Sequence, residues 1–196
     1  MDTGKAVFIT GPMFCGKTEE LIRIAHRYKI ADKNTLILKK RGENRYGENV
    51  IVTHNNRAIK AKEINSFTEV FPVISNMATY REINAVFIDE VQFIKDITKD
   101  NINHVTKLGI NLYMSGLTLD SFQLPFSEII GFLPYVDIVQ LESVCNFCGR
   151  FNAKYTFRNF KENTEQIFVG GIDSYKAICA SCLNKEKINE QKNNNS

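Results

Sequence analysis

The chain has 196 residues, of which 43% are hydrophobic and 24% are charged, a composition typical of globular proteins. Its net charge of +3 is too small to make nucleic acid or an anionic membrane the expected main partner. No apolar run approaches the roughly 18 residues of a membrane-spanning helix, and the N-terminus leaves no room for a signal peptide. We therefore expect a cytoplasmic protein that binds neither membrane nor nucleic acid.

The most specific motif is a glycine-rich loop near the N-terminus. It has the pattern G-x-x-x-x-G-K-T and consists of Gly11, Pro12, Met13, Phe14, Cys15, Gly16, Lys17 and Thr18. A strand is predicted before it at residues 6–10 and a helix after it at residues 17–30, the context in which such a loop binds phosphate. Its backbone N–H groups and the helix N-terminus would face the same anion. We expect Lys17 to bind the β- and γ-phosphates of ATP, and Thr18 to bind Mg²⁺. The alternative is an incidental glycine-rich turn.

The chain then continues to alternate strands and helices. Strands are predicted at residues 35–39, 50–53, 85–88 and 111–114, and a helix at residues 95–108. A weaker helix is expected to begin near Ser66, which can form a capping box with Glu69. Residues 40–56 are mostly polar and are predicted to form a long loop around one short strand. This order predicts an α/β fold of the RecA-like P-loop type, a parallel sheet flanked by helices.

Two carboxylates, Asp89 and Glu90, follow the predicted strand at residues 85–88. A carboxylate at the end of a neighbouring strand can share Mg²⁺ with a phosphate-binding loop, so Asp89 is the expected partner of Thr18. Glu90 would then lie close enough to the γ-phosphate to take a proton from an attacking hydroxyl or water. The alternative is an acidic pair that is solvated or caps a helix.

The C-terminal part contains two C-x-x-C pairs, Cys145 with Cys148 and Cys179 with Cys182. Four thiolates in this pattern predict a structural Zn²⁺ site that closes the long intervening segment at its base, the alternative being redox-active or free cysteines. Cys15 is left over in the phosphate loop. We interpret it as a small residue at a variable position, and a thiol made acidic by Lys17 and the helix N-terminus is the alternative.

The predicted domain organisation has three parts. Residues 1–142 form the nucleotide-binding domain, residues 143–184 form a small zinc-ribbon-like domain, and residues 185–196 form a disordered polar tail ending in Asn-Asn-Asn-Ser.

These motifs together resemble the type II thymidine kinases, the cytosolic, zinc-containing family. The resemblance extends from about Ala6 to Lys185. It rests on the glycine-rich loop with its Gly-Pro-Met-Phe opening, on Asp89-Glu90-x-Gln92-Phe93, on both cysteine pairs, and on Val169-Gly170-Gly171-x-Asp173-x-Tyr175. It implies ATP-dependent phosphorylation of the 5′-hydroxyl of thymidine, and of deoxyuridine, for nucleotide salvage.

The resemblance also implies roles for residues around ATP. Glu90 is similar to the general base, and Lys17 to the lysine that binds phosphate. Asp89 and Thr18 resemble the Mg²⁺ ligands, and Gln92 belongs to the same ATP and Mg²⁺ site. Glu43 and Arg45 align with an Asp-x-Arg-Tyr segment whose arginine stabilises the transferred phosphoryl group, with glutamate here in the aspartate position.

On the nucleoside side, the segment between the cysteine pairs resembles the lasso that folds over the substrate. The positions implied to contact the nucleoside are Phe93, Leu117, Phe122, Phe126, Thr156, Gln166, Ile167, Phe168, Val169, Gly170 and Tyr175. Among these, Thr156 matches a position near the thymine methyl and Tyr175 one at the deoxyribose. The family usually has an aromatic residue where this chain has Ser121, and we expect the adjacent Phe122 to stack on the base instead. A homotetramer and feedback inhibition by dTTP are further implications.

Three other functions fit parts of the pattern. A nucleic-acid-dependent ATPase could use the same Asp-Glu-x-Gln sequence, although one core domain and a nearly balanced charge are unusual for such a motor. A related kinase could phosphorylate deoxycytidine or a purine nucleoside instead. A regulatory protein without catalysis is the third possibility, but Lys17, Thr18, Asp89 and Glu90 are all intact.

Overall fold

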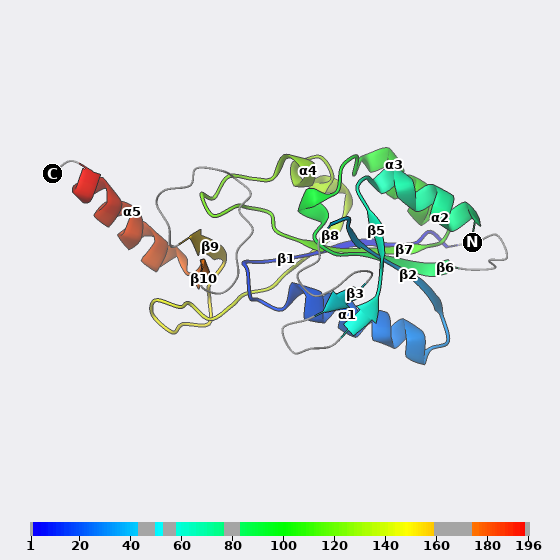
Figure 1. Cartoon of the computed structure of the whole chain (residues 1–196), viewed down its shortest axis with the longest axis horizontal. Coiled ribbons are helices and arrows are strands. Elements are labelled where there is room, and N and C mark those ends of the chain that lie inside the picture. The colour runs from blue at the N-terminus through cyan, green and yellow to red at the C-terminus, as the bar shows by residue number, and fades with distance from the viewer. Residues whose placement is uncertain (1, 43–49, 53–57, 77–82, 159–173, 195–196) are drawn as a thin grey trace.

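The computed structural model describes residues 2–42, 50–52, 58–76, 83–158 and 174–194. Its centre is a six-stranded parallel sheet with the order β5-β2-β6-β7-β1-β8 (Figure 1). The strands are β1 (Ala6–Thr10), β2 (Asn34–Lys40), β5 (Lys62–Ile64), β6 (Ile83–Ile88), β7 (Asn111–Gly116) and β8 (Asp137–Gln140). The predicted parallel α/β fold is confirmed.

Helices cover both faces of this sheet, which explains why its central strands are continuous apolar runs. On one face, Val7 and Ile9 pack against Leu21 and Ala25 of α1 (Lys17–Ile30). The other face holds the larger core cluster, which contains residues of α2 (Val70–Asn76), α3 (Lys99–Lys107) and α4 (Ser127–Ile130). Figure 1 shows α1 on the opposite side of the sheet from these three helices. Alternate residues of the central strands β1, β2, β6 and β7 therefore contribute to two separate cores.

The boundaries of several elements follow local rules. β1 and α1 have the predicted bounds, and Ser66 and Glu69 form the predicted capping box at the start of η1 (Phe67–Glu69), which leads into α2. α3 begins at Lys99 rather than near residue 95, because the side chain of Thr98 caps it by accepting a hydrogen bond from the Asn101 N–H at 3.2 Å.

Four short strands were not predicted from the sequence. They are β4 (Ala58–Lys60), which pairs with the predicted β3 (Val50–Val52), the two sheet-edge strands β5 and β8, and β10 (Tyr175–Ile178). All residues of β8 are exposed, so it has no buried apolar face that a sequence pattern could reveal.

The C-terminal residues form a small lobe with its own core. β9 (Tyr155–Arg158) and β10 are antiparallel, and α5 (Ala180–Asn194) follows them. The lobe core contains Cys145, Ala153, Ala177, Ile178, Cys179 and Leu183. Figure 1 shows the lobe at the end of the sheet where β1 leads toward α1. The division into domains at residue 143 remains a proposal that this separate core supports.

The polar tail differs from its prediction. Disorder was expected from residue 185 onward, but α5 continues to Asn194. Helix formation is costly only at its first turn, and the lobe core holds that turn through Leu183. The following Lys, Glu and Gln residues have good helix propensity, so the helix can continue beyond this first turn. In the part of the chain that the structure describes, no helix combines the length and apolar character needed to cross a bilayer.

Candidate active site

The glycine-rich loop connects β1 to α1 in a conformation that depends on its glycines. Gly11 has a φ of 147°, and a Cβ there would lie 2.4 Å from the carbonyl oxygen of Leu141 and 2.7 Å from the Cys15 sulfur. Gly16 has a φ of 86° and is the N-cap residue of α1, with no side-chain hydrogen bond capping the helix. Because Gly16 has no side chain that could cap α1, it leaves the first N–H groups of the helix available to bind an anion.

Lys17 folds back over this loop. Its Nζ donates hydrogen bonds to the carbonyl oxygens of Pro12 at 2.7 Å and Gly11 at 3.3 Å. The ammonium group therefore lies inside the curve of the loop, where it can neutralise bound phosphate. The binding of Lys17 to the β- and γ-phosphates stays a prediction.

The predicted Mg²⁺ ligands are adjacent. The Thr18 hydroxyl donates to Asp89 Oδ2 at 3.0 Å, so the loop and the end of β6 meet as expected. Asp89 also accepts a hydrogen bond from the hydroxyl of Ser115 at the end of β7. Burial, and then the charge of Glu90, raise the pKa of the Asp89 carboxyl to about 6, although both hydroxyl groups partly oppose the increase. A hydroxyl and a carboxylate are the oxygen ligands that Mg²⁺ prefers, so these residues fit the ion.

Glu90 lies directly beyond β6 in an unusual backbone conformation. Its φ of 54° and ψ of 44° are in the left-handed region, which is uncommon for a residue with a side chain and is found preferentially at functional sites. Its backbone N–H donates to Asp89 Oδ1 at 3.1 Å, and its carboxylate accepts a hydrogen bond from Gln92. Glu90 is thus held next to the predicted Mg²⁺ ligands, where the predicted general base would have to lie.

Several predicted nucleoside contacts gather beside this centre. Phe93 and Phe126 make an edge-to-face contact with ring centroids 6.0 Å apart, and Leu117 packs against the same core. Phe122 is 45% exposed, on a turn that Asp120 stabilises by accepting hydrogen bonds from the N–H groups of Phe122 and Leu124. The stacking role of Phe122 remains a prediction.

The C-terminal lobe contacts the phosphate loop directly. The Thr156 hydroxyl accepts a hydrogen bond from the Met13 N–H at 3.0 Å, and Ser143 donates to the Phe14 carbonyl at 3.3 Å. Tyr175 is buried on the neighbouring strand, with the Arg158 guanidinium 6.0 Å from its ring centroid. Thr156 and Tyr175 therefore belong to the lobe that adjoins the loop. Five predicted nucleoside contacts (Gln166, Ile167, Phe168, Val169 and Gly170) lie outside the described residues, as do Glu43 and Arg45.

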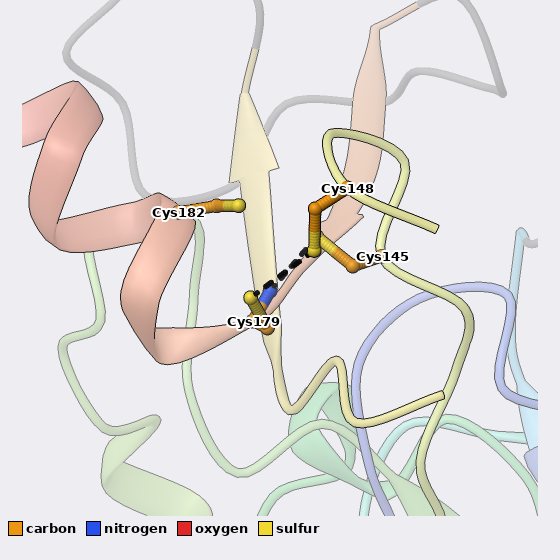
Figure 2. A group of neighbouring side chains, drawn as sticks. All are labelled: Cys145, Cys148, Cys179 and Cys182. Atoms are coloured by element: carbon orange, nitrogen blue, oxygen red, sulfur yellow. Dashed lines mark hydrogen bonds between the residues drawn. The ribbon is translucent and has the colours of Figure 1, made fainter. Parts of the chain in front are cut away.

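The four cysteines form one cluster (Figure 2). Their sulfur atoms all lie within 4.8 Å of one another, and those of Cys148 and Cys179 are 3.8 Å apart. Tetrahedral zinc with Zn–S bonds of about 2.3 Å requires sulfur atoms about 3.8 Å apart, so the donor set fits Zn²⁺. Burial raises the pKa of the Cys145 thiol, but hydrogen bonds from backbone N–H groups, first that of Cys179, outweigh burial and lower the pKa to about 6. A thiolate is the form that binds metal.

Comparison with known proteins agrees with this geometry. A family model described as thymidine kinase matches residues 4–183. The chain is 31% identical to a thymidine kinase of Pseudothermotoga lettingae over 93% of its own length and 96% of that protein. It is 36% identical to a thymidine kinase of Acanthamoeba polyphaga mimivirus, over 91% and 81% of the two chains. This chain belongs to the thymidine kinase family.

The cysteine cluster is consistent with the zinc-containing type II thymidine kinases. The matched region includes both the glycine-rich loop and all four clustered cysteines. The predicted family is thereby confirmed, and the individual site roles remain proposals.

Some residues of this thymidine kinase site were not predicted from its sequence. Ser115 could have been noticed as a polar residue that closely follows the apolar run of β7. Gln123, whose side chain donates to the Thr156 carbonyl oxygen at 3.3 Å, has no local signal. The alternative of an acidic Cys15 thiol is wrong in this structure, because burial raises its pKa and the nearby Lys17 opposes this only in part.

Proposed function

We propose that this protein is a thymidine kinase that transfers the γ-phosphoryl group of ATP to the 5′-hydroxyl of thymidine and so makes dTMP. Family membership over residues 4–183 supports this activity. The structural observation that carries the mechanism is the contact of Thr18 with Asp89 at 3.0 Å, with Glu90 next in the chain. Deoxyuridine, which differs from thymidine by one methyl group, is proposed as a second acceptor, because a missing methyl costs only about 1–3 kcal/mol of recognition.

The proposed reaction uses the chain's own groups in defined roles. Glu90 accepts the proton of the 5′-hydroxyl as the oxygen forms its bond to the γ-phosphorus. The bond between the γ-phosphorus and the β,γ-bridging oxygen breaks, and ADP leaves with that electron pair. Lys17 and the loop N–H groups bind the phosphates in line with the acceptor, and Arg45 is proposed to stabilise the transferred group. Thr18 and Asp89 would hold the Mg²⁺ bound with ATP, which would neutralise charge on the phosphates.

The lobe with the four cysteines is proposed to close over the acceptor. Zn²⁺ would be structural, because four sulfur ligands leave no open coordination position for chemistry. Excluding water matters in a phosphoryl-transfer site because water competes with the intended hydroxyl. From the family resemblance we also propose a homotetramer, inhibition by dTTP and a cytoplasmic location.

The proposed activity is tested with a panel of nucleosides. Purified protein with Mg-ATP is offered thymidine, deoxyuridine, deoxycytidine, deoxyadenosine and deoxyguanosine, and wild type is compared with Glu90→Ala and Glu90→Gln. Monophosphate is expected from thymidine and deoxyuridine only. Loss of a general base lowers kcat by roughly 10²–10⁴, while ATP binding should persist. Turnover above about a tenth of wild type in Glu90→Ala would contradict the base role. Absence of any nucleotide product, with ATP hydrolysis stimulated by single-stranded DNA, would favour a nucleic-acid-dependent ATPase.

A further inference from the structure

The side chain of Gln92 connects Glu90 to the strand on the other side of the site. Gln92 belongs to η2 (Val91–Phe93), which follows β6, and it is only 3% exposed. Its Nε2 donates to Glu90 Oε2, while its Oε1 accepts a hydrogen bond from the Leu117 N–H at 3.0 Å. One buried amide therefore bridges the proposed base and the first residue beyond β7.

The neighbouring residue Gly116 leaves space for this amide. A Cβ on Gly116 would lie 2.5 Å from Gln92 Oε1 and 2.9 Å from Val91 Cγ2. The φ of Gly116 is not in the left-handed region, so its backbone conformation does not require glycine. Glycine is required at position 116 because a larger residue would collide with its neighbours. Position 116 and position 92 are thus coupled by direct contact.

The Glu90 side chain needs such a restraint. A glutamate has three side-chain torsions, and its own backbone already has the unfavourable φ of 54°. A catalytic group must stay within about 0.5 Å of its productive position, which requires support from surrounding hydrogen bonds. Water could also bind the carboxylate, but it would not fix the carboxylate relative to β7.

We propose that Gln92 is a positioning residue, which holds the Glu90 carboxylate at a fixed position relative to Leu117. Leu117 is one of the residues predicted to contact the nucleoside. This proposal rests on the proposed function, in which Glu90 is the base. It gives Gln92 a role different from the direct contact with ATP and Mg²⁺ that the sequence predicts, since both polar atoms of its amide contact protein groups. The consequence is that loss of the amide should affect turnover more than ATP binding.

The first test is Gln92→Met, which keeps the length of the side chain and removes both hydrogen bonds. Loss of a residue that orients a metal ligand typically costs about 10–100-fold in activity, and we expect kcat to fall by a similar factor when the group that orients Glu90 is lost. The KM for ATP should change by less than about threefold. Gln140→Met, on the exposed strand β8, is the matched control for the same substitution. A raised KM for ATP with kcat unchanged would overturn the proposal in favour of direct nucleotide contact.

A double-mutant cycle separates positioning from a general loss of stability. Gly116→Ala should displace the amide and lower kcat in the wild-type background. In Gln92→Ala the contact with the amide oxygen is absent and only the contacts with Val91 remain, so the same Gly116→Ala change should lower kcat by a clearly smaller factor than in wild type. Equal losses in the two backgrounds would show that Gly116 and Gln92 act independently, and would overturn the proposal.

Hydrogen exchange supplies a measurement that needs no activity. The Leu117 N–H should exchange faster in Gln92→Met than in wild type, as measured by mass spectrometry on a peptide that includes Leu117. Unchanged exchange would overturn the bridge in any case. If wild type phosphorylates no nucleoside, the proposed function fails, and the exchange result then decides the Gln92 bridge alone.

Discussion

The Thr156 hydroxyl accepts a hydrogen bond from the Met13 N–H at 3.0 Å, so a strand of the cysteine lobe contacts the phosphate loop. Thr156 is 4% exposed, and the same residue accepts a hydrogen bond at its carbonyl oxygen from Gln123 at 3.3 Å. One residue of β9 is thereby joined both to the loop proposed to bind ATP and to the turn beside the proposed nucleoside site. Changes at Thr156 should therefore affect both substrates.

Thr156→Val tests this joint contact because it retains the shape of threonine and removes the acceptor. The Met13 N–H loses its partner, which costs about 1–3 kcal/mol when the group remains buried. We expect KM to rise for both ATP and thymidine, each by about three- to tenfold, with a lower melting temperature. Steady-state kinetics with each substrate varied in turn gives the two values. Thr156→Ser keeps a hydroxyl and should behave much more like wild type. An increase in the KM for thymidine alone would show that Thr156 supports only the nucleoside site.

The turn at Gln123 makes a more local prediction. Gln123 has a φ of 63°, and its side-chain amide donates to the Ser121 carbonyl at 2.7 Å as well as to Thr156. Gln123→Met keeps the backbone strain and removes both hydrogen bonds, whereas Gln123→Gly also removes the strain. Both changes should raise the KM for thymidine about two- to fivefold and leave the KM for ATP nearly unchanged. The glycine variant should be the more stable of the two in thermal unfolding. A change in the KM for ATP alone would contradict the assignment of the Gln123 turn to the nucleoside site.

How far the sequence predicts this site depends on whether a contact belongs to a contiguous motif or follows from a rule of the fold. The glycine-rich loop and its flanking strand and helix are contiguous, so spacing alone predicted them. The pairing of Thr18 with Asp89 was also predictable, because parallel strands bring their carboxyl ends to one edge of the sheet. The hydroxyl of Ser115, which bonds to Asp89 across 26 positions, gave only the weak signal of a polar residue in an apolar strand.

Contacts that follow neither a motif nor a rule of sheet topology gave no usable pattern. The Met13 to Thr156 hydrogen bond spans 143 positions and depends on how the lobe packs against the loop. The Gly116 requirement is visible only once Gln92 Oε1 is found 2.5 Å from the space its Cβ would occupy. Exposed elements such as β8 were missed for a different reason, since they bury no apolar face whose periodicity could be recognised.

The buried carboxyl of Asp89 makes a prediction about stability and pH. Its pKa in the folded protein, about 6, is raised above the ordinary value of 3.8, so the folded state prefers the protonated form. Ionisation of Asp89 therefore destabilises the folded state. The penalty is absent below about pH 4, grows as the pH rises toward 6 and is complete above it, where it amounts to roughly 3 kcal/mol.

Asp89→Asn removes this charge and keeps an acceptor for Ser115. In the absence of Mg²⁺ we expect the variant to be more stable than wild type by about 1–3 kcal/mol at pH 8, and by less at pH 5. Thymidine phosphorylation should be lost, because the amide is a poor Mg²⁺ ligand. Denaturant unfolding of both proteins at the two pH values measures the difference. An advantage of the same size at both values would show that the Asp89 charge is not its source.

Removal of zinc should weaken thymidine binding more than ATP binding. The lobe has only a small hydrophobic core beside its four mutually adjacent thiols, so metal binding would supply much of its folding free energy. The six-stranded sheet has its own core and does not depend on the cysteines. Chelation should therefore unfold the lobe and leave the sheet folded. Because Thr156 and Tyr175 belong to the lobe, thymidine binding should fall by at least about tenfold.

The affinity for ATP should fall much less on chelation, because the only expected loss is the stabilisation that the Thr156 to Met13 hydrogen bond gives to the phosphate loop. Calorimetric titration of each ligand, before and after chelation, gives the two losses, with zinc content measured on the same samples. Cys148→Ser should reproduce the effect without a chelator, whereas Cys15→Ser, outside the cluster, should leave zinc content unchanged. Equal losses of affinity for the two ligands would mean that the lobe and the sheet fold as one cooperative unit, and would contradict a separately folded lobe.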